Sequence, residues 1–282
     1  MIFDPKDLKA LNLLAPPPRI SIAEWAEQKR EMPHGTTSEP GKYHVDRTPY
    51  QREPMEALTD SSLTEVILVW ARQTGKTTVM ENAIGYVIDV APGNVLIKYP
   101  TLDKAKKFSQ RKLSPFINSM PCLSSKITPF KSRKAGNTYF DKQFPGGSIT
   151  LIGANSAAGT RTLSCKWILQ DEIDSDRANI EGDPVSQADG RAENFHDAVF
   201  FKASTPTLRS SSRIWALWER SDQRTWLCPC PKCGHFQPLL WVMVRWEEGK
   251  PETAHMVCQN ANCKSNLSDF DRVRMIIAGQ WK

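Results

Sequence analysis

The sequence contains no apolar run long enough to cross a bilayer, and its first residues lack the basic-then-apolar pattern of a secretory signal. We therefore expect a cytosolic protein with no membrane partner. The seven cysteines are an odd number, and their spacing differs from the disulfide framework of a small secreted domain. With 282 residues, 40% of them hydrophobic and 24% charged, the chain can form one large α/β core and a small appendage.

A phosphate-binding loop is the most informative feature that is present. The apolar run 66–69 leads into Gly75-Lys76-Thr77, and apolar residues recur at helical spacing over 76–90. Such a strand, turn and helix can cradle the phosphates of a nucleoside triphosphate with backbone N–H groups. Lys76 would then reach the β and γ phosphates, and the Thr77 hydroxyl would hold Mg²⁺. The candidate nucleotide-binding residues of this loop are Gln73, Thr74, Gly75, Lys76, Thr77 and Thr78.

The loop departs from the full motif at one position. Trp70 stands where the motif has its first glycine. The alternative interpretation is therefore a surface turn between a strand and a helix that contains Gly-Lys-Thr by chance, since short motifs give many false positives.

Two adjacent acids support the nucleotide interpretation. Asp171 and Glu172 follow the short apolar run 167–169 closely, with no turn residue before them. At the end of a strand, Asp171 would hold Mg²⁺ and Glu172 would polarise the attacking water, the two roles that ATP hydrolysis requires. The alternative is an acidic helix N-terminus favoured by the helix dipole, formed by Asp171, Glu172, Asp174 and Asp176.

Together these segments resemble the large terminase subunits of tailed bacteriophages, and their lambda-type branch most of all. Residues 71–77, Asp171-Glu172 and 204–207 are similar to the phosphate loop, the Walker B pair and the coupling motif of that family. The segments 46–55 and 24–26 are similar to its upstream regions, so the resemblance runs from about Ser21 to the end of the chain.

The resemblance implies a P-loop ATPase motor that moves double-stranded viral DNA into a procapsid in the host cytoplasm. It implies ATP and Mg²⁺ as ligands. It also implies the small terminase subunit and the portal of the procapsid as partners, and a ring of identical subunits in the active state.

The resemblance also implies roles for five residues. Tyr50 and Gln51 correspond to the residues that contact adenine, although Tyr50 could instead pack on the core. Arg72 corresponds to an arginine finger supplied in cis, although it could instead bind a carboxylate and brace the loop. Ser204 and Thr205 correspond to the element that relays loss of the γ-phosphate, although they could be an ordinary strand end.

Positive charge is concentrated in one segment. The net charge is +6, but between Lys98 and Lys134 ten Lys/Arg residues accompany a single acid, Asp103. We expect a basic helix entered at Pro100-Thr101, with Phe108 and Leu113 turned inward, that grips DNA phosphates without reading bases. A solvated helix face is the alternative. The candidate DNA-binding residues of this helix are Lys104, Lys106, Lys107, Arg111 and Lys112. Arg161, at the end of the small-residue loop 153–161, is a further candidate. That loop could instead approach the nucleotide of a neighbouring subunit or be a plain connection.

The order of elements predicts an α/β fold with a mostly parallel sheet. The expected strands are 66–69, 95–98, 148–152, 167–169 and 198–203, with helices on both faces and ligands at the carboxyl ends. We divide the chain into an N-terminal arm or lid (1–45, with a helix at 22–30), a P-loop ATPase domain (46–220, opening with a helix at 49–58) and a zinc-ribbon-like segment (221–282).

Four cysteines predict a structural zinc site. Cys230 and Cys233 form one short-spaced pair, and Cys258 and Cys263 form another, so four thiolates can complete a tetrahedral site. Free thiols are the alternative. The one-residue spacing of Cys228 to Cys230 leaves it outside the set, and His235 and His255 are the substitute ligands if one cysteine is excluded.

Large terminases resembling this chain usually continue into a metal-dependent nuclease domain. This chain ends where the zinc-ribbon-like segment would lead into such a domain, and too few residues follow Lys250 to form one. We therefore expect no nuclease activity, whether the chain is a fragment or a natural split product. A helicase-type or transposition-type ATPase, and a DNA-binding module without hydrolysis, are the alternative functions; Glu172 argues against the second.

Overall fold

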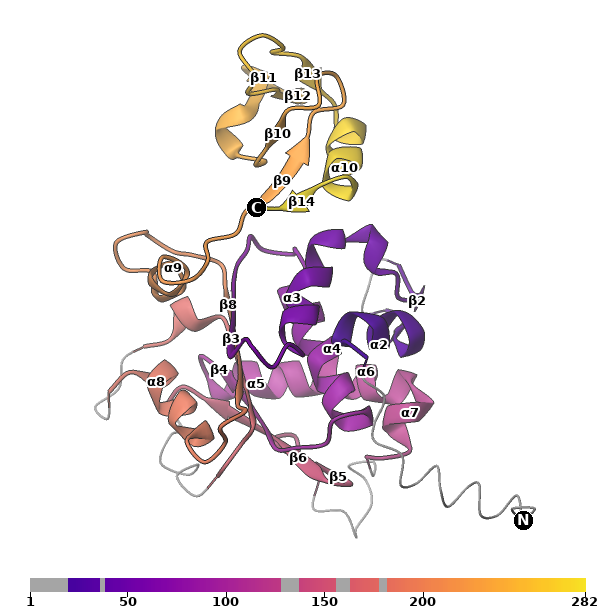
Figure 1. The fold of residues 1–282 in the computed structure, drawn as a ribbon, viewed down its shortest axis with the longest axis vertical. Helices are drawn as coiled ribbons and strands as arrows, with labels where there is room; N and C mark the ends of the chain where they lie inside the picture. Colours follow the sequence, from indigo (N-terminus) through magenta and orange to yellow (C-terminus); the bar gives the residue numbers. More distant parts are fainter. Residues whose placement is uncertain (1–19, 36–38, 128–136, 156–162, 178–181) are drawn as a thin grey trace, which may run out of the picture.

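A six-stranded sheet forms the centre of the chain in the computed structural model, which describes residues 20–35, 39–127, 137–155, 163–177 and 182–282 (Figure 1). The strand order is β3-β8-β7-β4-β6-β5, and every neighbouring pair is parallel except β5 and β6. The strands are β3 (Glu65–Val69), β4 (Val95–Tyr99), β5 (Asp141–Phe144), β6 (Gly147–Gly153), β7 (Trp167–Asp171) and β8 (Val199–Ser204). The predicted α/β class with a mostly parallel sheet is confirmed.

All five predicted strands are present, with bounds that shift by one or two residues. The sequence does not predict β5, an edge strand in which only Lys142 and Phe144 are buried. Its sequence, Asp-Lys-Gln-Phe, lacks the apolar run by which the inner strands are recognised, because an edge strand has a solvated face.

The sheet is covered on both faces, so its central strands are buried throughout. In β4, Val95, Ile97 and Tyr99 belong to the main core, whereas Leu96 belongs to a second cluster on the opposite face. This alternation follows from the two-residue period of a strand. The main-core face is covered by α2 (Ile22–Lys29), α4 (Lys76–Asp89), α6 (Ser114–Ser119) and α7 (Pro121–Ser124), and the other by α8 (Pro184–Asp189), η6 (Gly190–Ala192) and α9 (Arg213–Trp218).

The N-terminal helix α2 is part of this core. Ile22 and Trp25 are fully buried, and the Trp25 indole Nε1 donates to Asp89 Oδ2 at 2.9 Å. Trp25 also lies against Gly85 of α4, where an added Cβ would come within 2.1 Å of the ring. The sequence places this helix in an arm or lid, but in the structure α2 packs on the main core of the sheet, because its apolar face needs a partner.

The helix predicted at 49–58 divides into two short elements. A 3₁₀ turn, η2 (Pro49–Gln51), precedes α3 (Arg52–Ala57). Pro54 lies in the first turn of α3, where a missing backbone N–H breaks no intrahelical bond.

The predicted basic helix is present, capped at Thr101, whose side chain accepts from the Lys104 backbone N–H. It consists of α5 (Leu102–Phe108) and a π-helical segment, η3 (Ser109–Leu113). Phe108 and Leu113 are buried, as predicted, and Arg111 is exposed. One face of this helix therefore packs on the core while the other presents cations to solvent.

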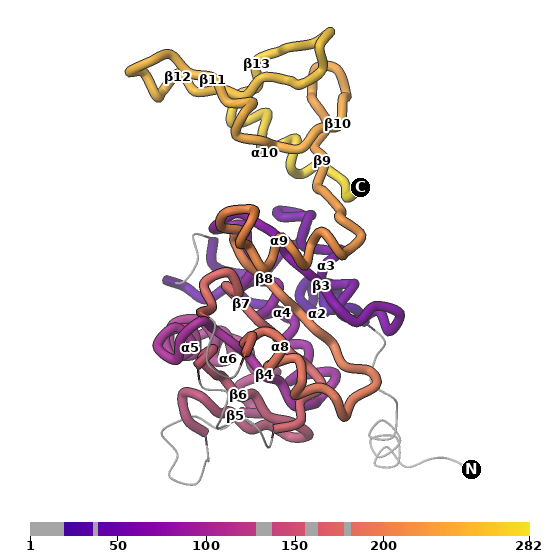
Figure 2. Tube along the Cα trace, turned by 90° about the vertical axis from the view of Figure 1, so that its left-hand side faces the viewer, coloured from indigo at the N-terminus to yellow at the C-terminus, as the bar shows by residue number. Residues whose placement is uncertain are grey.

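The residues from Arg224 onward form a small unit beyond the carboxyl end of β8, which we call the C-terminal piece. It is visible above the main body in Figure 1 and again in the perpendicular view of Figure 2. It has a core of its own around Met243, Met256, Leu267 and Met275. Its elements are β9 (Trp226–Pro229), β10 (Phe236–Gln237), η7 (Trp241–Met243), β11 (Val244–Glu247), β12 (Lys250–Val257), β13 (Asn266–Leu267), α10 (Asp269–Ile277) and β14 (Gln280–Trp281). The remaining short elements of the described residues are β1 (Glu31–Met32), β2 (Gly41–Lys42), η1 (Val45–Arg47) and η5 (Ile173–Ser175). Among the described residues, no helix is both long and apolar enough for a membrane span.

Candidate nucleotide site and cysteine cluster

The loop between β3 and α4 has the backbone conformation of a tight turn. Gln73 (φ 61°) and Gly75 (φ 88°) are left-handed, and Gly75 is the N-cap of α4. A Cβ on Gly75 would lie 2.1 Å from Gln51 Nε2, so both the positive φ and the close approach require glycine. Residues 76–78 form the half-buried N-terminal turn of a 14-residue helix, the part of a helix whose N–H groups attract anions.

Lys76 connects this loop to another strand. Its Nζ donates to the backbone oxygens of Trp70 at 3.0 Å and Ala71 at 2.7 Å, and to Thr205 Oγ1 at 3.0 Å. Burial lowers the pKa of Lys76, and the negative charges of Asp171 and Glu172 partly offset that effect. The ammonium therefore has oxygen ligands of the kind that phosphate oxygens could replace.

Asp171 lies opposite the start of α4, at the carboxyl end of β7. Its Oδ2 accepts from Thr77 Oγ1 at 3.2 Å and from Tyr99 Oη at 3.3 Å, and its Oδ1 accepts from the Glu172 backbone N–H at 2.9 Å. Burial, with a contribution from the neighbouring Glu172 charge, raises the pKa of Asp171 to about 6. The structure thus brings together Thr77 and Asp171, the two predicted Mg²⁺ ligands.

Glu172 follows in a left-handed conformation, with φ 58° and ψ 36°. A residue other than glycine in this region carries strain, which is common where side chains act on a substrate. Its carboxylate forms an ion pair with Lys104, and both side chains are about half exposed. The sequence assigns these two residues to separate tasks, hydrolysis and DNA binding, but the structure places them in contact.

Tyr50 and Gln51 lie against the phosphate loop. The Tyr50 hydroxyl and the Gln51 amide both donate to the Thr74 carbonyl, at 3.1 and 3.3 Å. Gln51 is buried and also accepts from the Tyr43 hydroxyl at 3.1 Å. Contact of Gln51 with an adenine edge would require this side chain to leave its present partners.

Ser204 and Thr205 link the end of β8 to the phosphate loop and to the turn after Glu172. Thr205 receives the Lys76 ammonium, and Ser204 Oγ accepts from the Asp174 backbone N–H at 3.2 Å. The Asp174 carboxylate in turn accepts from the Thr207 backbone N–H at 2.9 Å. A hydrogen-bonded path therefore joins the phosphate loop, the end of β8 and the turn after Glu172.

The remaining loop residues differ in exposure. Arg72 and Gln73 are exposed, whereas Thr78 is half-buried. The Thr78 carbonyl accepts from the buried Arg30 guanidinium at 3.4 Å. Arg72 is therefore open to solvent beside the loop, and its role stays a prediction.

The predicted DNA-binding cations are exposed on α5 and η3. Lys104 pairs with Glu172, and Lys107 pairs with Asp103 at 2.7 Å within the helix. Lys106 lies over the Tyr139 ring at 5.4 Å. Lys112 lines a cavity of about 120 Å³ together with Thr77 and Thr78. Arg161 lies outside the described residues.

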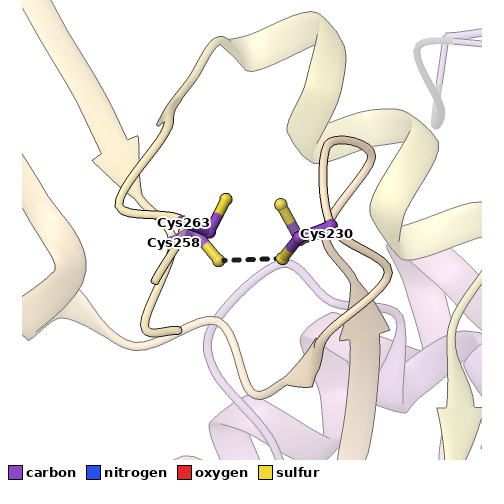
Figure 3. A group of neighbouring side chains, drawn as sticks. Cys230, Cys258 and Cys263 are labelled. Atoms are coloured by element: carbon purple, nitrogen blue, oxygen red, sulfur yellow. Dashed lines mark hydrogen bonds between the residues drawn. The ribbon is translucent and has the colours of Figure 1, made fainter. Parts of the chain in front are cut away.

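Four cysteine sulfurs converge in the C-terminal piece, where Cys230, Cys258 and Cys263 point toward a common centre (Figure 3). Together with Cys233, their Sγ atoms all lie within 4.8 Å of one another. Zn–S bonds of about 2.3 Å in a tetrahedron separate sulfurs by about 3.8 Å, and the Cys233 and Cys258 sulfurs are 3.8 Å apart. Neither Cys228 nor the two histidines join this group.

The two cysteine pairs lie in matching turns. The Cys230 N–H bonds to the His235 carbonyl and the Cys258 N–H to the Ser265 carbonyl, at 2.9 and 3.0 Å. Each turn also contains a residue with positive φ, Gly234 in the first and Lys264 in the second. The thiolate set and its supporting turns fit a structural zinc ion that is held entirely by protein.

Two residues in the nucleotide region are missed by sequence reasoning. Tyr99, at the carboxyl end of β4, contacts Asp171, and Trp281, at the end of the chain, donates from Nε1 to the Tyr50 carbonyl at 3.2 Å. The rule that ligand-binding side chains follow parallel strands could have identified Tyr99. Trp281 is far along the chain from the loop, and no local pattern identifies it.

Comparison with known proteins gives consistent matches. The model of the family "phage terminase large subunit gpA, ATPase domain" matches residues 37–281. The chain is 25% identical to the terminase large subunit of Enterobacteria phage P21 over 281 residues, covering 96% of this chain and 43% of that protein. It is 24% identical to the terminase large subunit of Escherichia phage lambda over 270 residues, covering 92% and 42%.

The crystal structure of the HK97 bacteriophage large terminase has a similar fold, with a TM-score of 0.55 and 16% identity over 71% of this chain and 40% of that one. The chain thus spans less than half the length of the relatives that it matches. The match over residues 37–281 establishes that this chain belongs to the phage terminase large subunit family, of the gpA type, through its ATPase domain.

Proposed function

We propose that the chain hydrolyses ATP to ADP and phosphate and uses the energy to translocate double-stranded DNA into a procapsid. The proposal that ATP is hydrolysed rests on one observation: at the carboxyl ends of β3 and β7, the structure has Lys76, Thr77, Asp171 and Glu172 close together. Those four side chains supply a phosphate cation, two metal ligands and a base within one site.

Each of these residues has a distinct task in this proposal. The phosphates lie over the N-terminus of α4, and the Lys76 ammonium exchanges its two carbonyl partners for phosphate oxygens. Thr77 and Asp171 would hold Mg²⁺, which would supply positive charge to the phosphates. Glu172 leaves Lys104 and accepts a proton from the attacking water. Arg72 stabilises the negative charge that develops on the transferred group.

The same residues give a route from the nucleotide to DNA. When Lys76 turns to phosphate, Thr205 loses a partner that it has in this structure. When Glu172 turns to water, Lys104 on the basic helix is released. Movement of α5 would be transmitted to DNA bound by the neighbouring cations Lys106 and Arg111. These cations would contact phosphates and would not read bases. We also propose, from the family, that the small terminase subunit and the portal are partners and that the active motor is a ring.

The adenine contact and the metal site complete the proposal. Tyr50 and Gln51 would hold the base beside the phosphate loop. Cys230, Cys233, Cys258 and Cys263 would hold one structural zinc ion, because their sulfurs already lie at separations close to those of a tetrahedral site. With no open coordination position, this metal would stabilise the fold and take no part in catalysis.

The first prediction concerns turnover. Glu172→Gln should keep ATP binding but lower kcat by on the order of a hundredfold or more, because the base is lost while the phosphate contacts remain. Lys76→Ala should weaken both binding and turnover. Rates of phosphate release, with and without duplex DNA, measure the effect; wild-type turnover in Glu172→Gln would refute the assignment of the base.

Arg72→Ala separates the two roles open to Arg72. As a finger, its loss should lower kcat by on the order of a thousandfold with little change in ATP affinity. A change in affinity alone would make Arg72 a brace of the loop.

The second prediction concerns pH. The pKa of Asp171 is raised to about 6, so the carboxylate is charged above that pH and takes up a proton as the pH falls. Because a metal ligand must be deprotonated, apparent Mg²⁺ affinity should fall by roughly tenfold per pH unit below about 6. Calorimetric titration of Mg²⁺ into the nucleotide complex measures it.

Asp171→Asn is the control for the pH titration. Titration of the nucleotide itself is common to both proteins, so the difference between them isolates Asp171. The variant should bind Mg²⁺ weakly at every pH, and an equal pH dependence in both proteins would contradict the assignment.

The third prediction concerns DNA. Reversal of Lys106, Lys107 and Arg111 to Glu should weaken binding of any duplex sequence and make the affinity less dependent on salt, since phosphate contacts release counterions. ATP affinity should not change. Fluorescence anisotropy across a salt series measures the binding.

A charge-matched control uses three exposed cations away from α5. Reversal of Arg220, Arg245 and Lys250 to Glu changes the net charge equally, but should leave duplex affinity closer to wild type. Equal losses in both triple variants would mean that only the overall charge matters and that α5 is a solvated face.

The fourth prediction concerns metal. Protein purified without chelator should contain about one zinc per chain. Cys233→Ser should lose most of it, whereas Cys228→Ser, outside the cluster, and Cys122→Ser, in the main body, should retain it. Elemental analysis of the folded proteins measures the zinc content per chain. Wild-type protein free of zinc would contradict the proposed site.

A further inference from the structure

Four aromatic rings join the C-terminal piece to the phosphate loop; we call them the aromatic junction. They are Tyr50, Trp70, Trp226 and Trp281. Tyr50 meets Trp70 edge-on at 5.3 Å and Trp226 at 6.1 Å, and Trp281 lies stacked on Trp70 at 6.4 Å with 15° between the planes. Trp226 and Trp281 are in edge contact at 5.4 Å. Each ring therefore contacts at least two others.

Polar contacts fix the junction in place. Trp281 Nε1 donates to the Tyr50 carbonyl at 3.2 Å, and Trp226 Nε1 donates to the Ile276 carbonyl at 3.2 Å. Arg224, just before β9, forms an ion pair with Glu53 of α3. The C-terminal piece is thus held to the segment that bears Tyr50 by an aromatic contact, a hydrogen bond and an ion pair.

The junction has little room for rearrangement. A Cβ on Gly279 would lie 2.3 Å from Trp226 Nε1, so the turn between α10 and β14 is packed directly against that ring. The register of β14 on β9 pairs Trp281 with Trp226. Displacement of β14 would therefore move Trp281 and disturb its contact with Trp226.

The junction also accounts for the departure from the phosphate-loop motif. Trp70 occupies the position of the first glycine, and its ring stacks on Trp281 while its carbonyl accepts from Lys76 at 3.0 Å. Tyr50, on the other side, donates to the Thr74 carbonyl. Both ends of the loop are therefore held by residues that contact the C-terminal piece.

We infer that Trp281 is a positioning residue for nucleotide binding, which acts through Tyr50 and Trp70 to hold the phosphate loop in its binding shape. The C-terminal piece thereby sets the affinity of a site to which it contributes no phosphate contact. This inference rests on the proposed ATPase function, because it requires that the loop bind a nucleotide.

The expected effect follows from the contacts. Loss of one aromatic pair and one hydrogen bond should weaken nucleotide binding by roughly three- to tenfold. The C-terminal piece has its own core, which does not include Trp281, so the variant should remain folded. Since Trp281 touches none of the predicted reacting groups, KM should rise while kcat stays within about twofold.

The test compares Trp281→Ala with wild type in the full chain. Calorimetry with Mg-ADP gives the dissociation constant, steady-state kinetics with ATP gives KM and kcat, and thermal melting and zinc content report on folding. Trp281→Phe, which keeps a ring in the stack, should recover most of the affinity. Trp241→Ala removes a highly exposed tryptophan of the same piece outside the junction and should match wild type.

The outcomes separate this inference from the proposed function. Wild-type protein that fails to bind Mg-ADP would refute the nucleotide site itself. Wild-type binding with an unchanged dissociation constant in a folded Trp281→Ala variant would overturn the positioning role alone. A fall in kcat without a rise in KM, or an equal effect of Trp241→Ala, would also overturn it.

Discussion

The position of one ammonium group organises the candidate site. Lys76 donates to two carbonyls of its own loop and to Thr205 at the end of β8, so a single cation fixes the loop against a neighbouring strand. Each of those oxygens is neutral, whereas a phosphate oxygen carries negative charge and is therefore the stronger partner for an ammonium. A bound triphosphate can therefore rearrange the loop and the end of β8 in one step.

The parallel sheet delivers the other groups to the same place. The strands β3, β8, β7 and β4 end side by side. The loop, the Ser204-Thr205 pair, Asp171 and Tyr99 lie at or just beyond these ends. Asp171 is buried because it is the last residue of a central strand covered on both faces, and burial raises its pKa. Glu172, one residue later, has left the strand and reaches solvent and Lys104.

Much of this arrangement could be predicted from the sequence, because its signals are local. Buried parallel strands appear as short apolar runs, and Gly75-Lys76-Thr77, Asp171-Glu172 and the cysteine pairs are compact motifs. The edge strand β5, the packing of α2 in the core, the Lys104–Glu172 pair and the aromatic junction depend on contacts between distant segments. Trp70 is an example. In the sequence it is only a departure from the phosphate-loop motif, whereas in the structure its ring stacks on Trp281.

The most direct measurement is a crystal structure of the chain with Mg²⁺ and a non-hydrolysable ATP analogue. We expect the Lys76 ammonium to leave the Trp70 and Ala71 carbonyls for the β and γ phosphates, with Thr77 and Asp171 at the metal and Glu172 turned from Lys104 toward the γ-phosphate. An analogue bound elsewhere, or a Lys76 that keeps its two carbonyl partners beside a bound triphosphate, would contradict it.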